Sequence, residues 1–236
     1  MADKLTKKEL EQPDEFHTIG WHILQYISEH KKNFYLAGAI VLLAIILSGV
    51  WYLYRLDHEN RAQSLYSSAY NSYSVPGNPK EDMRGAYLKA LGIYEELVKE
   101  YPGSHTASLA LYNMGNLYFN VDNMEKAIES YRAFLKRSGK HDILISLAHH
   151  GLGYCYEETE DYDNALKSFE TSNKGVQGTR LEYINYANIA RIYEKTGKQK
   201  EAVEFYRRAA GKTNDPIIEM VVKAKIASLA SQGDEK

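Results

Sequence analysis

The feature that most constrains this chain is an uncharged apolar run from Asn33 to Tyr54, NFYLAGAIVLLAIILSGVWYLY. A helix rises ~1.5 Å per residue, so this run is long enough to cross a hydrocarbon core of about 30 Å. Aromatic residues stand at both of its ends, which is typical of the two membrane interfaces. A buried core helix is rarely free of charge over such a length, and the apolar region of a cleaved signal peptide is shorter. We therefore expect an uncleaved transmembrane helix over residues 33–55.

The polar tail before this span, residues 1–32, is predicted to contain a second helix. Between Glu15 and His30 the apolar residues recur near the helical period, which fits an amphipathic helix at the membrane surface or a simple extension of the anchor. The basic residues that flank the span nearly balance, with two lysines before it and two arginines after it. Further lysines in the tail favour a cytoplasmic N-terminus and a translocated C-terminal domain.

Composition excludes several classes of function. The formal net charge is −2, so the chain has no basic field that would hold a nucleic acid. Cys155 is the only cysteine, which rules out an internal disulfide and a cysteine-based zinc site. The chain is rich in tyrosine, with 20, and poor in proline, with five. These numbers favour a folded helical domain behind the span.

Small and aromatic residues recur in phase along the part of the chain that follows the span. One column of alanines has an aromatic residue four positions later, and a second column of small residues has a tyrosine three positions later. Both columns repeat every 37 or 38 residues: Ala90, Ala127, Ala165 and Ala202 with Tyr94, Tyr131, Phe169 and Tyr206, and Gly115, Gly153 and Ala190 with Tyr118, Tyr156 and Tyr193. Small residues allow two helices to approach closely, and the aromatic ring fills the space beside the contact.

The sequence thus predicts an all-α fold, with a single N-terminal transmembrane helix followed by an α-solenoid of antiparallel helix pairs over residues 56–236. Short segments rich in Asn, Asp and Gly separate the two helices of each pair. The Asp215-Pro216 pair predicts the start of a C-terminal capping helix. The expected units are repeats at about 57–104, 105–142, 143–180 and 181–214, and a capping helix at 216–231.

The segments LYNMGNLYFNVDNMEKAIESYRAF, GLGYCYEETEDYDNALKSF and NIARIYEKTGKQKEAVEFY resemble the tetratricopeptide (TPR) pattern. The resemblance implies a concave groove, lined by the first helix of each repeat, that binds protein. Subfamilies that clamp a C-terminal carboxylate use groove lysines, and Tyr112 occupies the position of one of them. The repeat phase predicts these groove residues: Tyr112, Asn116, Phe119, Asn120, His150, Tyr154, Glu157, Glu158, Arg191, Glu194 and Lys195.

We expect no enzyme activity, cofactor or metal site. The chain lacks a P-loop and the HExxH, GxSxG and GxGxxG motifs. Gly151 and Gly153 lack a preceding strand and a third glycine, which indicates helix packing. His149 and His150 are adjacent and so point to different faces of a helix. A hydrolase with an unrecognised site is the least favoured alternative.

The complete layout resembles the YfgM-like family, the ancillary subunit of the bacterial Sec translocon. The similarity extends over the segments FHTIGWHILQYISEHKKN, SGVWYLYR, RAQSLYSSAY and EMVVKAKIASL. It implies a single-pass protein of the bacterial inner membrane, with periplasmic repeats. The implied partners are Sec translocon subunits, a membrane-anchored periplasmic chaperone and exported polypeptides. Two alternatives stay open: an adaptor of another envelope assembly or secretion machine, and an adaptor whose repeats lie in the cytoplasm.

Overall fold

The computed structural model describes residues 15–74, 83–139, 143–212 and 215–233. Predictions for the tail before residue 15 and for the segment 75–82 lie outside these residues. The chain divides into two compact units, Met1–Asp57 and His58–Lys236. All regular structure in the described part of the chain is helical, which agrees with the all-α prediction.

The first unit contains α1 (Glu15–Glu29) and the N-terminal part of α2 (Lys31–Ser74). Among the described residues, α2 is the one helix whose length and composition would allow it to cross a membrane, with a mean hydropathy of 2.4 over its most apolar window. None of that window is buried, whereas a core helix of a soluble protein would be mostly buried. The helix is a candidate span, and its crossing of a membrane stays a prediction.

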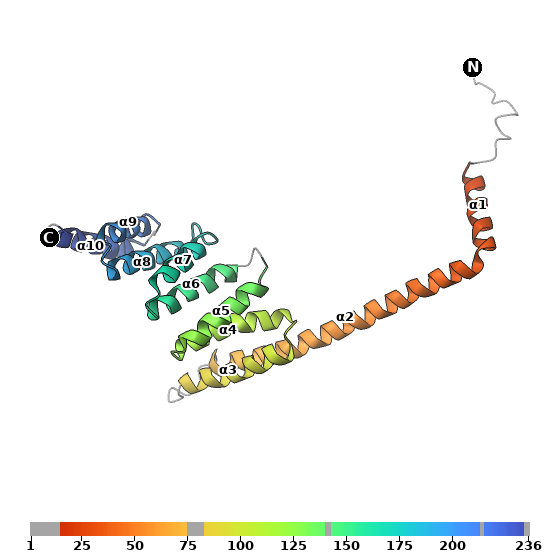
Figure 1. The fold of residues 1–236 in the computed structure, drawn as a ribbon, viewed down its shortest axis with the longest axis horizontal. Helices are drawn as coiled ribbons and strands as arrows, with labels where there is room; N and C mark the ends of the chain where they lie inside the picture. Colours follow the sequence, from red (N-terminus) through yellow and green to blue (C-terminus); the bar gives the residue numbers. More distant parts are fainter. Residues whose placement is uncertain (1–14, 75–82, 140–142, 213–214, 234–236) are drawn as a thin grey trace, which may run out of the picture. The chain divides into compact units, whose positions relative to one another are not determined.

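The boundary between the two units lies inside α2, after Asp57, so the second unit begins with the C-terminal part of this helix. The helix runs without a break from Lys31 to Ser74. The sequence predicts an anchor that ends at residue 55 and a first repeat helix just beyond it, and the structure has one helix through both. The described residues beyond α2 form eight more helices, coloured from yellow to blue in Figure 1: α3 (Met83–Glu100), α4 (His105–Asn120), α5 (Met124–Arg137), α6 (Ile143–Glu158), α7 (Tyr162–Asn173), α8 (Arg180–Lys195), α9 (Gln199–Ala210) and α10 (Pro216–Gly233).

Helices that are neighbours in the chain pack together from α3 to α10, and α4 also contacts α6 directly. Glu59 of α2 joins the start of this stack. Its carboxylate accepts hydrogen bonds from the backbone N–H groups of His105 and Thr106, at 3.0 and 2.9 Å, where α4 begins. Burial raises the pKa of Glu59, but a hydrogen bond from the Thr106 hydroxyl, together with the two backbone bonds, outweighs it and holds the pKa below its usual value. A carboxylate at a helix N-terminus accepts hydrogen bonds from free N–H groups and interacts favourably with the positive end of the helix dipole.

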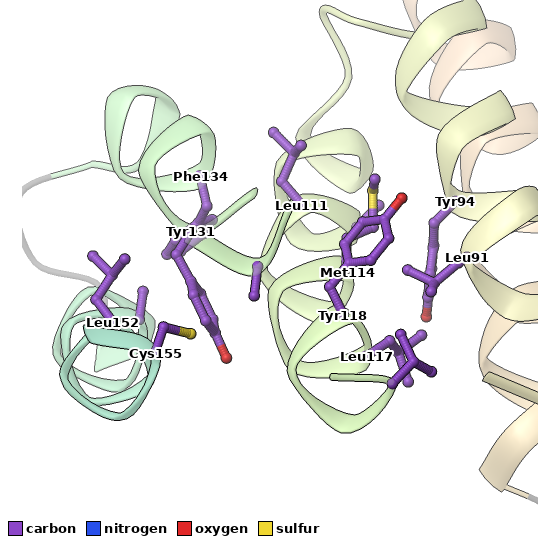
Figure 2. Close-up of a cluster of buried hydrophobic side chains, with 14 of the residues drawn as sticks. Leu91, Tyr94, Leu111, Met114, Leu117, Tyr118, Tyr131, Phe134, Leu152 and Cys155 are labelled. Carbon is purple, nitrogen blue, oxygen red and sulfur yellow. The ribbon is translucent and has the colours of Figure 1, made fainter. Parts of the chain in front are cut away.

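The core follows the two columns of small and aromatic residues. A methyl group added to Gly115 would lie 2.6 Å from the Tyr131 ring, and one added to Gly153 would lie 2.5 Å from the Phe169 ring. Both rings are almost fully buried. Figure 2 shows Tyr131 between Cys155 and the helix that carries Tyr118. Each glycine is therefore required by a ring that lies directly on its Cα.

Three turns inside helix pairs that the structure describes, those of α4–α5, α6–α7 and α8–α9, share one backbone geometry. Asp122, Glu160 and Gly197 stand at equivalent positions and have φ values of 66°, 59° and 74°. In each turn the next residue donates its N–H to the carbonyl of a tyrosine in the second column, at 2.8 Å. This is the Schellman arrangement, in which a left-handed residue lets the chain satisfy the last carbonyls of a helix. Only one of the three positions has the glycine that this conformation favours.

The C-terminal helix, α10, begins at Pro216. The Asp215 carboxylate accepts a hydrogen bond from the N–H of Ile217 at 2.9 Å, which is an N-cap contact. Val222 and Leu229 of α10 are buried in a small cluster with Ala202 and Tyr206. The helix therefore covers the last repeat.

Candidate functional site

One pocket lies where α4, α5 and α6 meet and has a volume of about 300 Å³. Four of its residues come from α4, one from α5 and four from α6. None of them is an acidic residue, a lysine or an arginine, and the one histidine among them is His150. The lining residues are Tyr112, Asn116, Phe119, Asn120, Tyr131, Leu147, His150, Gly151 and Tyr154.

Tyr131 spans the base of this pocket from α5. Its ring lies against Gly115 on one side and Gly151 on the other, since a methyl group on Gly151 would meet the phenol at 2.5 Å. The Tyr131 hydroxyl donates a hydrogen bond to Oδ1 of Asn116 at 2.7 Å. Burial raises the pKa of Tyr131, so the phenol stays protonated and keeps this bond. The base of the pocket is thus a fixed aromatic surface.

His150 forms one wall of the pocket and is held by a buried amide. Asn185 of α8 is fully buried and donates from Nδ2 to Ser172 Oγ and Asn173 Oδ1, at 2.9 and 2.8 Å. Its Oδ1 is therefore the acceptor that faces Nδ1 of His150, 2.7 Å away, and Nδ1 carries the proton. Burial lowers the pKa of His150, with a smaller opposing effect of this bond. The imidazole is neutral at pH 7, and its Nε2 is an acceptor.

Tyr154 completes the wall beside His150. The two ring centroids are 4.7 Å apart and nearly perpendicular, and Phe119 of α4 lies 6.3 Å from Tyr154. The Tyr154 hydroxyl accepts a hydrogen bond from Asn188 of α8 at 3.0 Å. These contacts fix the ring before any ligand arrives, which lowers the entropy lost on binding.

The stretch between α6 and α8 is occupied by the protein's own ion pairs. Glu157 is buried, and its carboxylate accepts hydrogen bonds from Arg191 and lies 2.9 Å from Nζ of Lys195. Burial raises the pKa of Glu157, but the two cations outweigh it and hold the pKa below its usual value. Arg191 also lies over the Tyr154 ring, 5.8 Å from its centroid. This stretch therefore stabilises the stacking of α6 on α8.

The predicted groove residues separate into six that line the pocket, three that form an ion-pair cluster and two that belong to neither. Six of them line the pocket: Tyr112, Asn116, Phe119, Asn120, His150 and Tyr154. Glu157, Arg191 and Lys195 form the ion-pair cluster. Glu194 accepts from the Tyr206 hydroxyl at 3.2 Å and pairs with Lys225 of α10, whereas Glu158 is exposed outside the pocket.

Sequence reasoning missed three residues of the pocket, Tyr131, Leu147 and Gly151. Tyr131 belongs to the first aromatic column, whose pattern predicts only a structural role. The sequence predicts a packing role for Gly151, and this glycine contacts the ring that forms the base. The signal for both was their place in the repeat, because a ring between two repeats lies beside the groove that those repeats form.

No cluster of three or more His, Cys, Asp or Glu residues that could hold a metal ion occurs in the part of the chain that the structure describes. Cys155 is fully buried, and burial raises the pKa of its thiol to about 12. A thiol with such a pKa is protonated at neutral pH and is a poor nucleophile.

The model of the family described as a tetratricopeptide repeat-like domain matches residues 25–231. Photosystem I assembly protein Ycf3 from Synechococcus sp. (strain CC9605) is 30% identical over 125 residues, which cover 51% of this chain and 72% of that protein. Response regulator aspartate phosphatase H from Bacillus subtilis (strain 168) is 23% identical over 150 residues, which cover 58% of this chain but only 39% of the phosphatase.

Solved structures show the same fold at lower identity. A crystal structure of MamA protein has a TM-score of 0.55 at 16% identity and covers 73% of this chain and 86% of MamA. A structure of nearly identical TPR-like repeats from Podosopora anserina has a TM-score of 0.57 at 14% identity and covers 75% of this chain and 89% of its own. These similarities concern the helical repeat alone.

Proposed function

The chain belongs to the tetratricopeptide repeat-like domain family, whose repeats are a scaffold for protein–protein interaction, and we propose that it is a membrane-anchored adaptor of protein export. In this proposal α2 crosses the bacterial inner membrane with the N-terminus in the cytoplasm. The pocket between α4 and α6 receives an extended stretch of a partner protein in the periplasm. The partners are Sec translocon subunits, a membrane-anchored chaperone and newly exported polypeptides.

The observation that carries the proposal is an exposed apolar helix that continues directly into a repeat domain with a preformed pocket. The apolar window of α2 has no buried residue, and the helix continues to Ser74, whose neighbour Tyr73 contacts Tyr87 of α3 with ring centroids 6.0 Å apart. The match to the family begins at residue 25 and so includes the apolar segment. A cleavable signal sequence would be separate from the domain it exports, so this continuity favours a permanent anchor.

The pocket supports binding of polypeptide over binding of a charged small molecule. Its rings and amides can bury apolar side chains and bond to a peptide backbone, since rigid aromatic residues provide contact area at a small entropic cost. One relative is named as an assembly protein of photosystem I, which is consistent with a groove that holds partner subunits.

Membrane attachment is tested by fractionation. Membranes that contain the full chain are washed with sodium carbonate and then extracted with detergent. Our proposal expects the protein to stay in the pellet through the carbonate wash and to be released only by detergent. Release by carbonate alone would refute the anchor.

Location and partners need two further measurements. Protease added to spheroplasts should digest the repeat domain before lysis, and protection until lysis would place the domain in the cytoplasm. Chemical crosslinking of membranes, followed by purification of the chain, should recover Sec translocon subunits. Recovery of a different envelope complex in their place would support the second candidate, an adaptor of another assembly or secretion machine that uses the same pocket.

A further inference from the structure

The lining of the pocket between α4 and α6 is mostly aromatic and carries no charge, and this favours a particular kind of side chain as its ligand. Five of its lining residues are aromatic, counting the imidazole of His150, and none carries a charge at neutral pH. Arg191, which lies over the Tyr154 ring, and Lys195 are already held by Glu157. A charged side chain that entered this space would lose its hydration and gain no ionic partner, which is strongly unfavourable.

The rings of the pocket are arranged for contact with another ring. Tyr112 and Tyr131 lie 6.1 Å apart and tilted by 58°, and Phe119 and Tyr154 lie 6.3 Å apart and tilted by 48°. These pairs come from α4, α5 and α6, so their faces and edges surround the pocket. Aromatic pairs prefer such tilted arrangements at 4.5–7 Å. A volume of about 300 Å³ has room for one large side chain but not for a whole helix.

The wall of the pocket also offers a hydrogen-bond acceptor. Nδ1 of His150 is committed to Asn185, as described above. Among the described residues no partner is bonded to Nε2 of His150, and this atom is not among the buried polar atoms that lack a partner. It is therefore not fully buried, and it belongs to a ring that lines the pocket. In the neutral tautomer set by Asn185, Nε2 can accept a hydrogen bond but cannot donate one.

We propose that this pocket selects a tyrosine or tryptophan side chain of an extended polypeptide, whose ring packs among Tyr112, Phe119 and Tyr154 and whose O–H or N–H donates to Nε2 of His150. The proposal rests on the proposed role of the groove in binding polypeptide and adds its specificity. A site built to bond such a donor discriminates against a ring that lacks it, because the acceptor is then buried without a partner. The pocket thereby prefers tyrosine over phenylalanine and rejects aspartate and lysine.

The test uses the full chain in detergent and a fluorescently labelled, uncharged Ser-Thr-Gly host peptide with one central residue varied. The central residue is Tyr, Trp, Phe, Leu, Asp or Lys, and binding is read by fluorescence anisotropy. We expect the Tyr and Trp peptides to bind about fivefold or more tightly than the Phe peptide, as one hydrogen bond predicts. The Asp and Lys peptides should bind at least about tenfold more weakly than the Phe peptide.

Two variants separate the hydrogen bond from the packing. In His150→Phe the preference for Tyr over Phe should vanish while the Phe peptide still binds. His149→Phe is the matched control, since His149 lies next in the chain but outside the pocket, and it should leave the preference unchanged. Phe119→Ala should weaken the Tyr and Phe peptides alike. Circular dichroism confirms that each variant is folded, and if His150→Phe is not, the comparison of Tyr with Phe in the native chain decides alone.

The outcomes distinguish this inference from the proposed function. Equal binding of all six peptides, or a Tyr preference that survives in folded His150→Phe, overturns the inference and leaves the groove as a less selective polypeptide site. Binding of none of the peptides overturns both the inference and the role of the pocket in the proposed function.

Discussion

The close contact between Gly153 and Phe169 makes a quantitative prediction for Gly153→Ala. The new Cβ would lie 2.5 Å from Cε1 of Phe169, about 1 Å closer than two carbon atoms approach favourably. The ring cannot move away easily, because Phe169 is fully buried and Tyr154 packs on it with ring centroids 5.3 Å apart. Overpacking of this kind costs about 1–3 kcal/mol.

Helix propensity opposes that cost, because alanine inside a helix is favoured over glycine by about 0.5–1 kcal/mol. At the midpoints of these two ranges the net destabilisation of Gly153→Ala is about 1 kcal/mol. For a domain of this size each kcal/mol lowers Tm by about 2–4 °C. We therefore expect Tm to fall by roughly 2–4 °C.

Gly92→Ala is the matched control. Gly92 also lies inside a helix but is exposed, and a methyl group there would meet no atom within 4 Å. This variant has the gain in helix propensity without the clash, so its Tm should rise by about 1–4 °C. Thermal unfolding of both full-length variants in detergent, followed by circular dichroism, measures the two shifts. A Tm for Gly153→Ala that equals or exceeds that of the native chain would refute the packing role of the small-residue column.

Three further predictions follow from the turns, the buried ion pair and the thiol. Glu160→Gly relieves a left-handed residue and should stabilise the fold by about 0.5–1 kcal/mol, whereas Gly197→Ala should destabilise it by about 1 kcal/mol, as measured by chemical denaturation. The pKa of Glu157 is lowered in the folded state, so its contribution to stability is present at neutral pH and is lost as pH falls through that lowered value. Glu157→Gln should therefore lower Tm at pH 7 but reduce the loss of Tm between about pH 5 and pH 3; an unchanged acid profile would contradict this. Cys155 should react with a maleimide orders of magnitude more slowly in the folded chain than in denaturant, because burial raises the pKa of its thiol to about 12. Fast labelling of the native protein would show that α6 is not packed as described.

Much of the fold follows from the sequence, because the recurring small and aromatic residues mark the places where helices pack. The small and aromatic columns identify which residues lie between helices, and the structure places Tyr131 and Phe169 on the glycines that precede them by the same interval. The extent of α2 was not evident, because the anchor and the first repeat helix have different compositions and no helix-breaking residue separates them. The change in composition marks where the environment of the helix changes, but it does not reveal that the helix continues through that point.

The site was predicted only in part, for a physical reason. The repeat phase predicts a groove face on each first helix, and six of the predicted residues line the pocket. It does not reveal that Glu157 is neutralised by Arg191 and Lys195, because this pairing depends on how α6 stacks on α8. Nor does it reveal the tautomer of His150, which depends on Asn185 from another repeat.

The central claim is that a membrane-anchored repeat domain holds polypeptides in the pocket between α4 and α6, and site-specific photocrosslinking in intact membranes tests it most directly. A benzoylphenylalanine probe replaces Phe119 inside the pocket and, in a second variant, Glu129, which is exposed on α5 and lies outside it. We predict that the Phe119 probe yields adducts with polypeptides in the membrane fraction and that the Glu129 probe yields few or none. Adducts of equal yield from both positions, or none from Phe119, would contradict the claim.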